Sequence, residues 1–151
     1  MMDEDMTQNL FMNSPFIAWI HNISLNQQKY LKSKIEEFDF DHKMRYIIFI
    51  YDNPGCSQDD IVNMFGQSKG NIAKVLRKFE DDGYIERKTD PDNRRKYMLY
   101  TTEKGSEIAP KIRQISKDWE AEVGITDEDH ELKQRIMEIA INGMRLVGEG
   151  K

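Results

Sequence analysis

The side chains with the most evident chemistry are cations gathered in two short segments near the middle of the chain. The first segment carries Lys69, Lys74, Arg77 and Lys78 within ten residues. Lysine and arginine bind phosphate oxygens and guanine edges, and the amide of Asn71 can pair with adenine. The segment therefore has the composition of a nucleic-acid contact, although most such charges lie on an ordinary solvated helix face.

The spacing of apolar residues predicts a helix from an N-cap at Ser68 to about Asp82, ended by Gly83. Its apolar residues share one side and must face the core: Ile72, Val75, Leu76 and Phe79. Small residues between the charges would let the other side lie deep in a major groove. The residues predicted to contact DNA there are Ser68, Lys69, Gly70, Asn71, Ala73, Lys74, Arg77 and Lys78.

The order of charges along this helix is unfavourable for its own stability. Lys69 in the first turn opposes the helix dipole by about 0.3–1 kcal/mol. The acidic run 80–82 crowds the end of the helix that is already negative. This order favours a helix whose N-terminal end meets phosphates.

The second segment is a run of three adjacent cations: Arg94, Arg95 and Lys96. They lie at a predicted hairpin tip, between strand candidates at 84–89 and 96–101 and beside the turn residues 90–93. Because adjacent cations repel one another, the negative potential of a narrow minor groove would stabilise an inserted arginine. Asp92 is expected to pair with Arg94, an exposed pair worth about 0–1 kcal/mol. The alternative is a solvated loop tip.

A short helix precedes the first segment. Ser57 and Asp60 have the spacing of a capping pair, and Gly66 supplies a left-handed end. Two helices joined by so brief a turn predict a helix-turn-helix. Cys56 and Ile61 occupy the positions of a hydrophobic staple, so we expect Cys56 to be a buried apolar residue rather than an exposed redox sensor.

Two helices are predicted before this region. The first spans 14–38, with Ser14 as its cap and Pro15 in its first turn. Asp41 is predicted to open the second, which ends at 53–55. The residues expected to be buried on the second are Met44, Ile47, Ile48 and Tyr51.

Two further helices are predicted after the hairpin. Thr102 caps the first, Pro110 should bend it and Gly124 ends it. A capping pattern at 126–129 begins the last. The apolar stripe of the first is Ile108, Ile112, Ile115, Trp119 and Val123, and that of the last is Leu132, Ile136, Ile139, Ala140, Leu146 and Val147.

Together these elements predict a mainly α fold with a small β-hairpin wing (α+β). We expect a single domain over 1–151, with an N-terminal dimerisation helix at 14–38, a winged helix-turn-helix DNA-binding region at 41–104 and C-terminal dimerisation helices at 105–148. The terminal helices carry more apolar surface than one small domain needs, which predicts a homodimer, with packing inside one chain as the alternative. The predicted dimerisation residues are Phe16, Trp19, Ile20, Ile23, Trp119, Leu132, Ile136, Ile139 and Leu146.

The distribution of charge agrees with a local polyanion contact, although the chain as a whole has a net charge of −5. The stretch 68–104 holds ten Lys/Arg against seven Asp/Glu, whereas the remainder holds twelve against twenty. A locally basic segment in an acidic chain can bind a polyanion there and repel it elsewhere.

Several classes of function are disfavoured by what the sequence lacks. No catalytic or phosphate-loop motif is present, so we expect neither an enzyme nor a cofactor. The single Cys56 excludes an internal disulfide, and His21, His42 and His130 have no second ligand at metal spacing. No apolar run approaches the ~18 residues of a membrane span, and the acidic N-terminus lacks signal-peptide features. We therefore expect a cytoplasmic protein without a membrane partner.

Residues Ser57 to Gly105 resemble the winged-helix domain of the MarR family. The capped short helix and the run NIAKVLRKFEDDGYIERKTDPDNRRKYMLYTTEKG carry the resemblance, including the junction 79–87 and the wing positions Asp90 and Asp92. The resemblance implies homodimers with interlocked terminal helices, pseudo-palindromic double-stranded DNA operators near the protein's own gene and, in many members, release of DNA by a small phenolic or similar effector.

The resemblance also implies roles for individual residues. Arg94 would enter the minor groove, oriented by Asp92, while Asn71, Lys74 and Arg77 would contact the major groove. The sequence departs from the family in having Gly70 and Asn71 where small hydroxyl residues are common, which affects base specificity rather than DNA binding. The residues on or near the face where a ligand cleft would open are Gln27, Gln28 and Tyr30.

Two functions follow as hypotheses. The first is a homodimeric repressor whose DNA affinity responds to a ligand, and the second is a winged-helix module that binds protein without DNA. The basic wing distinguishes them, because replacing Arg94 and Arg95 by alanine should abolish binding only under the first. DNA binding should also weaken steeply with salt, because neutralised phosphates release their counterions.

Overall fold

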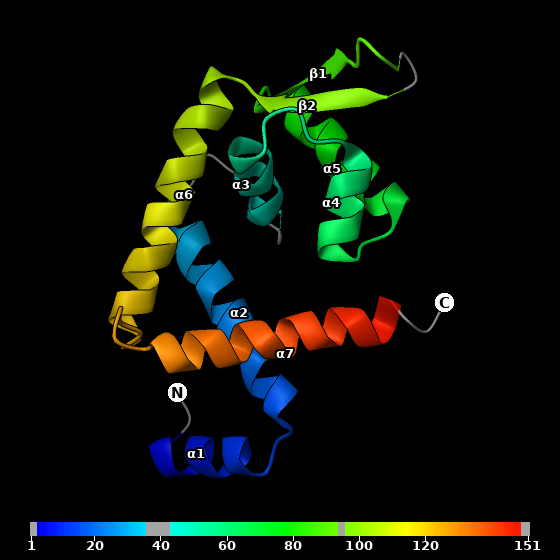
Figure 1. Ribbon diagram of the computed structural model, residues 1–151. Coiled ribbons are helices and arrows are strands. Elements are labelled where there is room, and N and C mark those ends of the chain that lie inside the picture. The colour runs from blue at the N-terminus through cyan, green and yellow to red at the C-terminus, as the bar shows by residue number, and fades with distance from the viewer. Residues whose placement is uncertain (1–2, 36–42, 94–95, 149–151) are drawn as a thin grey trace. The chain divides into compact units, whose positions relative to one another are not determined.

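The computed structural model describes residues 3–35, 43–93 and 96–148 (Figure 1). Contacts divide the chain into two compact units, Met1–His42 and Lys43–Lys151. The described residues form seven helices and one antiparallel hairpin, which confirms the predicted mainly α fold with a small wing. The domain ranges expected from the sequence stay a prediction.

The first unit contains two helices, α1 (Glu4–Met12) and α2 (Phe16–Lys34). Helix α1 was not predicted from the sequence, and it has no side-chain cap and no buried residue. Ser14 was expected to cap α2, and this is wrong, because Pro15 is the N-cap and the Ser14 hydroxyl donates to the carbonyl of Leu10 at 2.7 Å.

The end of α2 also differs from the prediction of a helix to residue 38. The helix stops at Lys34, since Ile35 has an extended backbone with φ −132° and ψ 93°. Residues 36–38, the remainder of the predicted helix, lie outside the described residues, as does Asp41, the expected start of the next helix.

The second unit opens with α3 (Met44–Asp52), whose C-cap is Asn53. Met44 and Ile47 are buried as predicted, but Ile48 and Tyr51 are only half-buried. The helix buries Tyr46 and Ile50 in their place. Because α3 is apolar on nearly every side, its pattern alone did not single out the face that packs against the rest of the unit.

The helix-turn-helix consists of α4 (Gln58–Phe65) and α5 (Lys69–Asp81). Ser57 and Asp60 form the predicted capping box, and Gly66 ends α4 with φ 62°. The hydroxyl of Ser68 accepts from the amide of Asn71 at 3.3 Å, which confirms it as the N-cap of α5. Gly83, with φ 76°, turns the chain out of α5.

The wing is the hairpin of β1 (Ile85–Thr89) and β2 (Tyr97–Thr101), in which Ile85 pairs with Thr101 and Thr89 with Tyr97. The loop before α4 extends this sheet, because the amide of Leu99 donates to the Cys56 carbonyl at 2.8 Å and the Gly55 amide donates to the Leu99 carbonyl at 2.8 Å. The wing is thereby anchored to the helix-turn-helix.

Two long helices complete the chain, α6 (Glu103–Glu122) and α7 (His130–Gly148). Thr102 caps α6 as predicted, and α6 packs against α3. Ile108 and Ile112 are buried, whereas the predicted apolar stripe continues half-buried at Ile115 and Trp119. Val123, which was expected to belong to this stripe, is 51% exposed.

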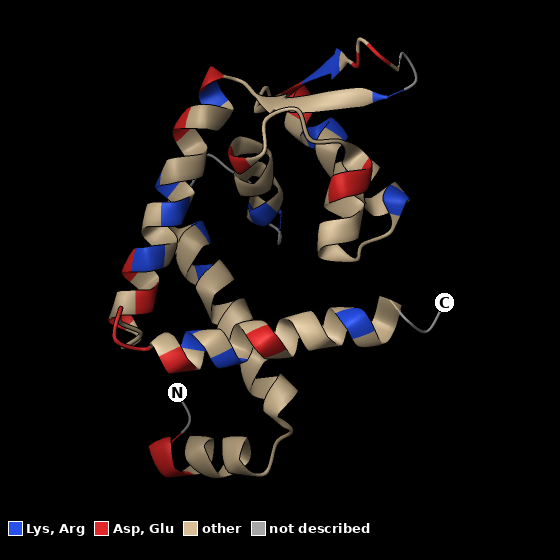
Figure 2. Cartoon of the chain, in the orientation of Figure 1, with Lys and Arg blue, Asp and Glu red and all other residues tan. Residues whose placement is uncertain are grey.

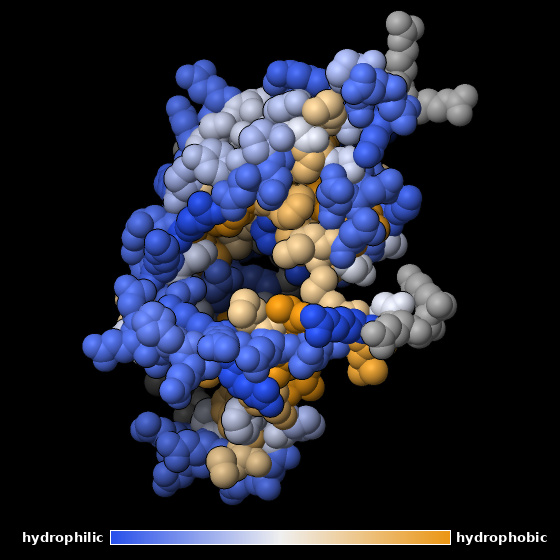
Figure 3. Space-filling model, in the orientation of Figure 1, coloured by the Kyte–Doolittle hydropathy of each residue, from blue (hydrophilic) through white to orange (hydrophobic). Residues whose placement is uncertain are grey.

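The amide of Thr126 donates to Asp129 at 2.7 Å, as the capping pattern predicted, but α7 begins only at His130 rather than within 126–129, and none of its residues is buried. Apolar side chains therefore lie exposed along this helix among charged ones (Figure 3): Leu132, Met137, Ile139, Ile141, Met144, Leu146 and Val147. Among the residues that the structure describes, no helix combines the length and apolar character needed to cross a bilayer.

Candidate nucleic-acid interface

The orientation of α5 is fixed by three side chains that its sequence placed on one face. Ile72, Leu76 and Phe79 are at most 2% exposed, while Val75 beside them is half-buried. The opposite face is consequently turned to solvent, and Lys and Arg are present on α5, on β1 and immediately before β2 (Figure 2). The predicted contact residues on the exposed face are Ser68, Lys69, Gly70, Asn71, Lys74 and Arg77, with Ala73 and Lys78 half-buried at its edge.

The cations of α5 divide into paired and unpaired ones. The Nζ atom of Lys69 lies 2.8 Å from Asp59 Oδ1, and the Nζ atom of Lys78 lies 3.0 Å from Asp82 Oδ2. Within the described parts of the chain, Lys74 and Arg77 have no carboxylate within 4.0 Å. These two side chains are therefore available to a polyanion without the loss of an existing ion pair.

Several charged side chains that are unfavourably placed along α5 form ion pairs that the sequence did not reveal. The Glu80 carboxylate lies 3.0 Å from the Nε atom of Arg87 on β1, and Asp82 forms an ion pair with Lys78. Lys69, at the other end, is paired with Asp59. The unfavourable dipole interactions are thus partly offset by ion pairs, and a phosphate at the N-terminal end stays a prediction.

Gly70 lies in the first turn of α5, and no described residue packs closely enough against it to require a glycine. A Cβ atom added there would meet no heavy atom within 4 Å, and its φ is not in the left-handed region. Glycine is costly in helices compared with alanine. The predicted close approach of Gly70 to DNA stays a prediction.

The turn of the wing is closed by Asp90. Its carboxylate accepts from the amide of Asp92 at 2.9 Å, and its own amide donates to the Lys96 carbonyl at 3.0 Å. Lys96 is exposed. Arg94 and Arg95, and with them the expected pair between Asp92 and Arg94, lie outside the described residues.

Helix α4, the start of α5 and the wing converge on one cavity of about 250 Å³, most of whose lining residues are polar or charged. Its lining combines cations of α5 and the hairpin with the first turn of α4: Ser57, Gln58, Asp59, Lys69, Arg87, Lys96, Tyr97 and Leu99. Lys69 and Lys96 were predicted from the sequence to contact DNA, and the structure brings them to this common cavity.

Arg87, Tyr97 and Asp59 are cavity residues that the sequence analysis missed as site residues. In the hairpin register Arg87 pairs with Leu99, two residues from Tyr97, so these three side chains share one face of the sheet. Because successive side chains of a strand point to opposite faces of the sheet, the sequence could have placed Arg87 on the same face as Tyr97. Asp59 could not be found that way, because its contact depends on how α4 and α5 pack.

Cys56 is half-buried, rather than fully buried as expected. Burial, together with the nearby Asp60 carboxylate, raises the pKa of its thiol to about 11. A thiol with so high a pKa is protonated at neutral pH and is a poor nucleophile. This favours the expected structural role over a redox role.

The predicted dimerisation residues differ in exposure. Phe16 and Ile23 on α2 are 46% and 47% exposed, while Trp19 and Ile20 are half-buried. Trp19 is held within its own unit, where its indole N–H donates to the Phe11 carbonyl at 2.7 Å. On the C-terminal helices Leu132, Ile139 and Leu146 are exposed, and Trp119 and Ile136 are half-buried.

The residues suggested near a ligand cleft on α2 are half-buried and engaged within that helix. The Gln28 amide donates to the Ser24 hydroxyl at 3.2 Å, and the Lys34 ammonium lies 5.2 Å from the centre of the Tyr30 ring. Gln27 is half-buried beside them.

Comparison with known proteins adds independent information about this arrangement. A family model described as MarR family matches residues 41–96. The HTH-type transcriptional regulator BilQ from Clostridioides difficile (strain CD3) is 26% identical over 123 residues, covering 81% of this chain and 83% of BilQ.

Solved structures extend the similarity to the whole chain. The crystal structure of MarR is 28% identical and matches with a TM-score of 0.77, covering 99% of each chain. A MarR-family regulator from Listeria monocytogenes, complexed with 26mer DNA, matches with a TM-score of 0.78, covering 91% of this chain and 97% of that chain. At 19% identity, this last likeness is one of fold.

Proposed function

We propose that the chain is a MarR-family transcriptional regulator, a repressor that binds a pseudo-palindromic double-stranded DNA operator as a homodimer in the cytoplasm. The observation that carries this proposal is the exposed face of α5, where Lys74 and Arg77 lack carboxylate partners among the described residues. Gly70 on the same face has no side chain and would allow DNA to approach closely, since open space surrounds it in the chain. The Listeria relative that shares this fold was solved with DNA.

In this proposal α5 enters the major groove. Asn71, Lys74 and Arg77 contact bases and phosphates there, with Ser68, Lys69, Gly70, Ala73 and Lys78 around them. The wing, with Arg94 inserted and Asp92, Arg95 and Lys96 beside it, lies in the adjacent minor groove.

The proposed homodimer is supported by apolar surface that one chain leaves uncovered. Helix α7 buries no residue, and Leu146 on it is 77% exposed. A second copy would cover these apolar side chains, and a two-fold axis would place two recognition helices about 34 Å apart, one turn of DNA. The operator would then share that two-fold symmetry.

A ligand response is also part of the proposal, and the second unit offers a cleft for it. A cavity of about 720 Å³ is bordered by the turn after α4 and by the C-terminal half of α7, with Phe65, Met144 and Val147 in its lining. Arg45 lies at the cavity, its guanidinium 5.0 Å from the centre of the Phe65 ring. This combination of apolar side chains and one cation suits a small phenolic or similar anion.

A mobility shift tests the proposal against the alternative of a protein-binding module. DNA that flanks the protein's own gene is titrated with the wild type and with the Arg94→Ala/Arg95→Ala variant at several salt concentrations. The proposal predicts a salt-sensitive shift that the variant loses. Wild-type protein that gives no shift, or one indifferent to salt, would favour the alternative.

A further inference from the structure

The cavity between the helix-turn-helix and the wing lies between the two elements that are proposed to bind DNA. In the proposed complex α5 occupies a major groove and the wing the neighbouring minor groove. The sugar–phosphate backbone that separates two grooves then passes between them. The cavity is bordered by the start of α5 through Lys69 and by the hairpin through Arg87 and Lys96.

The side chains of the cavity suit a single oxyanion. Arg87 uses only Nε for its ion pair with Glu80, and among the described residues its two terminal nitrogens have no partner. Lys96 has no ion pair among the described residues either. Tyr97, 52% exposed, adds a hydroxyl of the kind that donates to phosphates.

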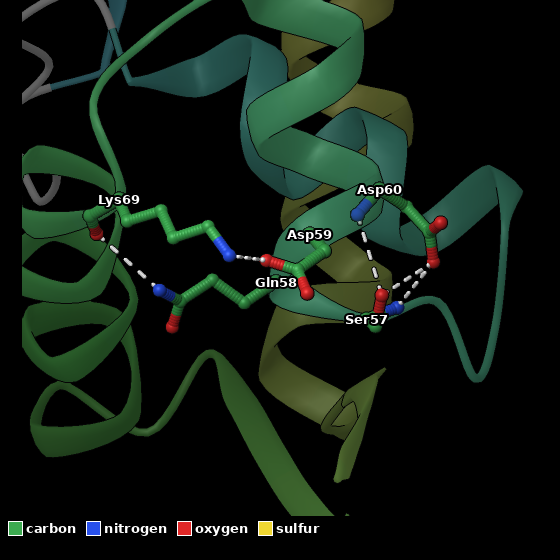
Figure 4. Close-up of polar contacts among 5 residues, drawn as sticks. All are labelled: Ser57, Gln58, Asp59, Asp60 and Lys69. Carbon is green, nitrogen blue, oxygen red and sulfur yellow. Dashed lines mark hydrogen bonds and ion pairs between the residues drawn. The ribbon is translucent and has the colours of Figure 1, made fainter.

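One acidic side chain of the cavity already forms an ion pair with one of its cations. The Asp59 carboxylate lies 2.8 Å from the Lys69 ammonium, and the neighbouring Gln58 amide donates to the Lys69 carbonyl at 3.3 Å (Figure 4). Both side chains of the pair are well exposed, at 72% for Lys69 and 58% for Asp59.

Asp59 differs from its neighbour Asp60 in what its carboxylate does. Asp60 accepts from the Ser57 amide and hydroxyl, both at 2.7 Å, and so completes the cap of α4 (Figure 4). Asp59 is not used by the cap, and among the described residues Lys69 is its sole ion-pair or hydrogen-bond partner. Both carboxylates lie in the first turn of α4, where negative charge stabilises the helix, but only Asp59 also forms an ion pair with α5.

We propose that Asp59 occupies the place of a backbone phosphate in the free protein and competes with DNA for Lys69. This inference rests on the proposed DNA-binding function and adds one step to it. When the duplex binds, Lys69 exchanges the Asp59 carboxylate for a phosphate that Arg87, Lys96 and Tyr97 also contact. Asp59 thereby lowers DNA affinity irrespective of base sequence, because a phosphate contact carries no sequence information.

The test is DNA affinity of the Asp59→Asn variant of the full chain. The probes are the duplex flanking its own gene and an unrelated duplex of equal length. We expect both to bind roughly threefold to fivefold more tightly, as the loss of one exposed ion pair and one nearby negative charge allows. Thermal unfolding of the same samples should show unchanged or slightly lower stability. A variant that binds either duplex no more tightly than wild type would overturn the proposal.

Asp52→Asn is the matched control, because Asp52 forms a similar exposed pair with Arg113 at 2.6 Å, away from the cavity. It removes the same charge and should leave affinity unchanged; an equal gain would show an effect of net charge alone and overturn the proposal. Lys69→Gln should reduce the slope of log affinity against log salt by about 0.9 for each phosphate that Lys69 no longer neutralises. Arg113→Gln should leave this slope unchanged. An unchanged slope for Lys69→Gln would likewise contradict the exchange.

Failure of this inference can be distinguished from failure of the proposed function. If wild-type protein binds DNA in a salt-sensitive way and Asp59→Asn does not tighten binding, only the role of Asp59 is wrong. If the wild type and Asp59→Asn both fail to bind either duplex, DNA binding itself is wrong, and the inference is overturned together with it.

Discussion

The backbone of Gly105 lies directly against the carbonyl oxygen of Tyr84, so that a Cβ atom at position 105 would overlap that oxygen. The same junction is held by the Thr102 amide, which donates to the Tyr84 carbonyl at 3.1 Å, and by the Thr102 hydroxyl, which donates to the Gly83 carbonyl at 2.6 Å. The exit of the wing into α6 is thereby fixed to the exit of α5 into β1.

Gly105→Ala should destabilise the protein because backbone must move to admit the methyl group. We expect a loss of about 1–3 kcal/mol in the free energy of unfolding, measured by urea denaturation. Gly70→Ala is the matched control, since its new methyl group meets open space, and it should raise stability by about 0.4–1 kcal/mol. Equal stability of the two variants would show that the junction is not tightly packed.

The capping box of α4 predicts a pH-dependent contribution to stability. The amide and then the hydroxyl of Ser57 hold the pKa of Asp60 below its usual value, and Lys96 adds to this. A carboxylate with a lowered pKa stabilises the folded state above its unfolded pKa, and that stabilisation is lost as the pH falls through the folded pKa.

Asp60→Asn should therefore be less stable than wild type at pH 7, and the difference should shrink below about pH 4. Ser57→Ala should cost about 0.5–2 kcal/mol at pH 7, as for other helix caps. Thermal unfolding measured from pH 3 to pH 7 tests both. A difference between wild type and Asp60→Asn that stays constant with pH would refute the role of the carboxylate.

Cys56 should react slowly with thiol reagents. Because its pKa is raised to about 11, the thiolate fraction at pH 7 is far below that of an ordinary cysteine. We expect alkylation by iodoacetamide, followed by mass spectrometry, to be slower than for unfolded protein at pH 8 and to accelerate towards pH 11. Alkylation of the folded protein at the unfolded rate at pH 8 would revive a redox role for this residue.

Dimerisation through the terminal helices predicts sensitivity to charge on the exposed apolar side of α7. Ile139→Lys, at a position 40% exposed in one chain, should leave the fold intact but shift the mass in sedimentation equilibrium from two chains to one. Gln134→Lys adds the same charge at a polar position of α7 and should remain dimeric. A wild-type protein with the mass of a single chain would contradict the homodimer.

The parts of the fold that could be predicted are those determined by neighbouring residues. Ser57 with Asp60, Gly66 and Thr102 set the limits of helices through bonds within four residues, and each has its predicted role. Ser14 was misassigned because Pro15 can occupy the N-cap itself, leaving the serine hydroxyl to bond backwards to Leu10.

The candidate interface was predictable only in part, for a related reason. The exposed face of α5 follows from the period of Ile72, Leu76 and Phe79 along one helix. The pairing of Lys69 with Asp59 and the entry of Arg87 into the same cavity depend on how separate elements pack. Such contacts have no signature in a single sequence read locally.

The central claim, that Lys74 and Arg77 of α5 meet DNA, is tested most directly by fluorescence anisotropy with the duplex flanking the protein's own gene. The Lys74→Gln/Arg77→Gln variant should bind at least about tenfold more weakly than wild type, with a salt slope reduced by about 0.9 for each phosphate that is no longer neutralised. Lys111→Gln/Lys117→Gln, which removes two exposed charges from α6, should bind like wild type. Equal affinities and equal slopes for both variants would contradict the account.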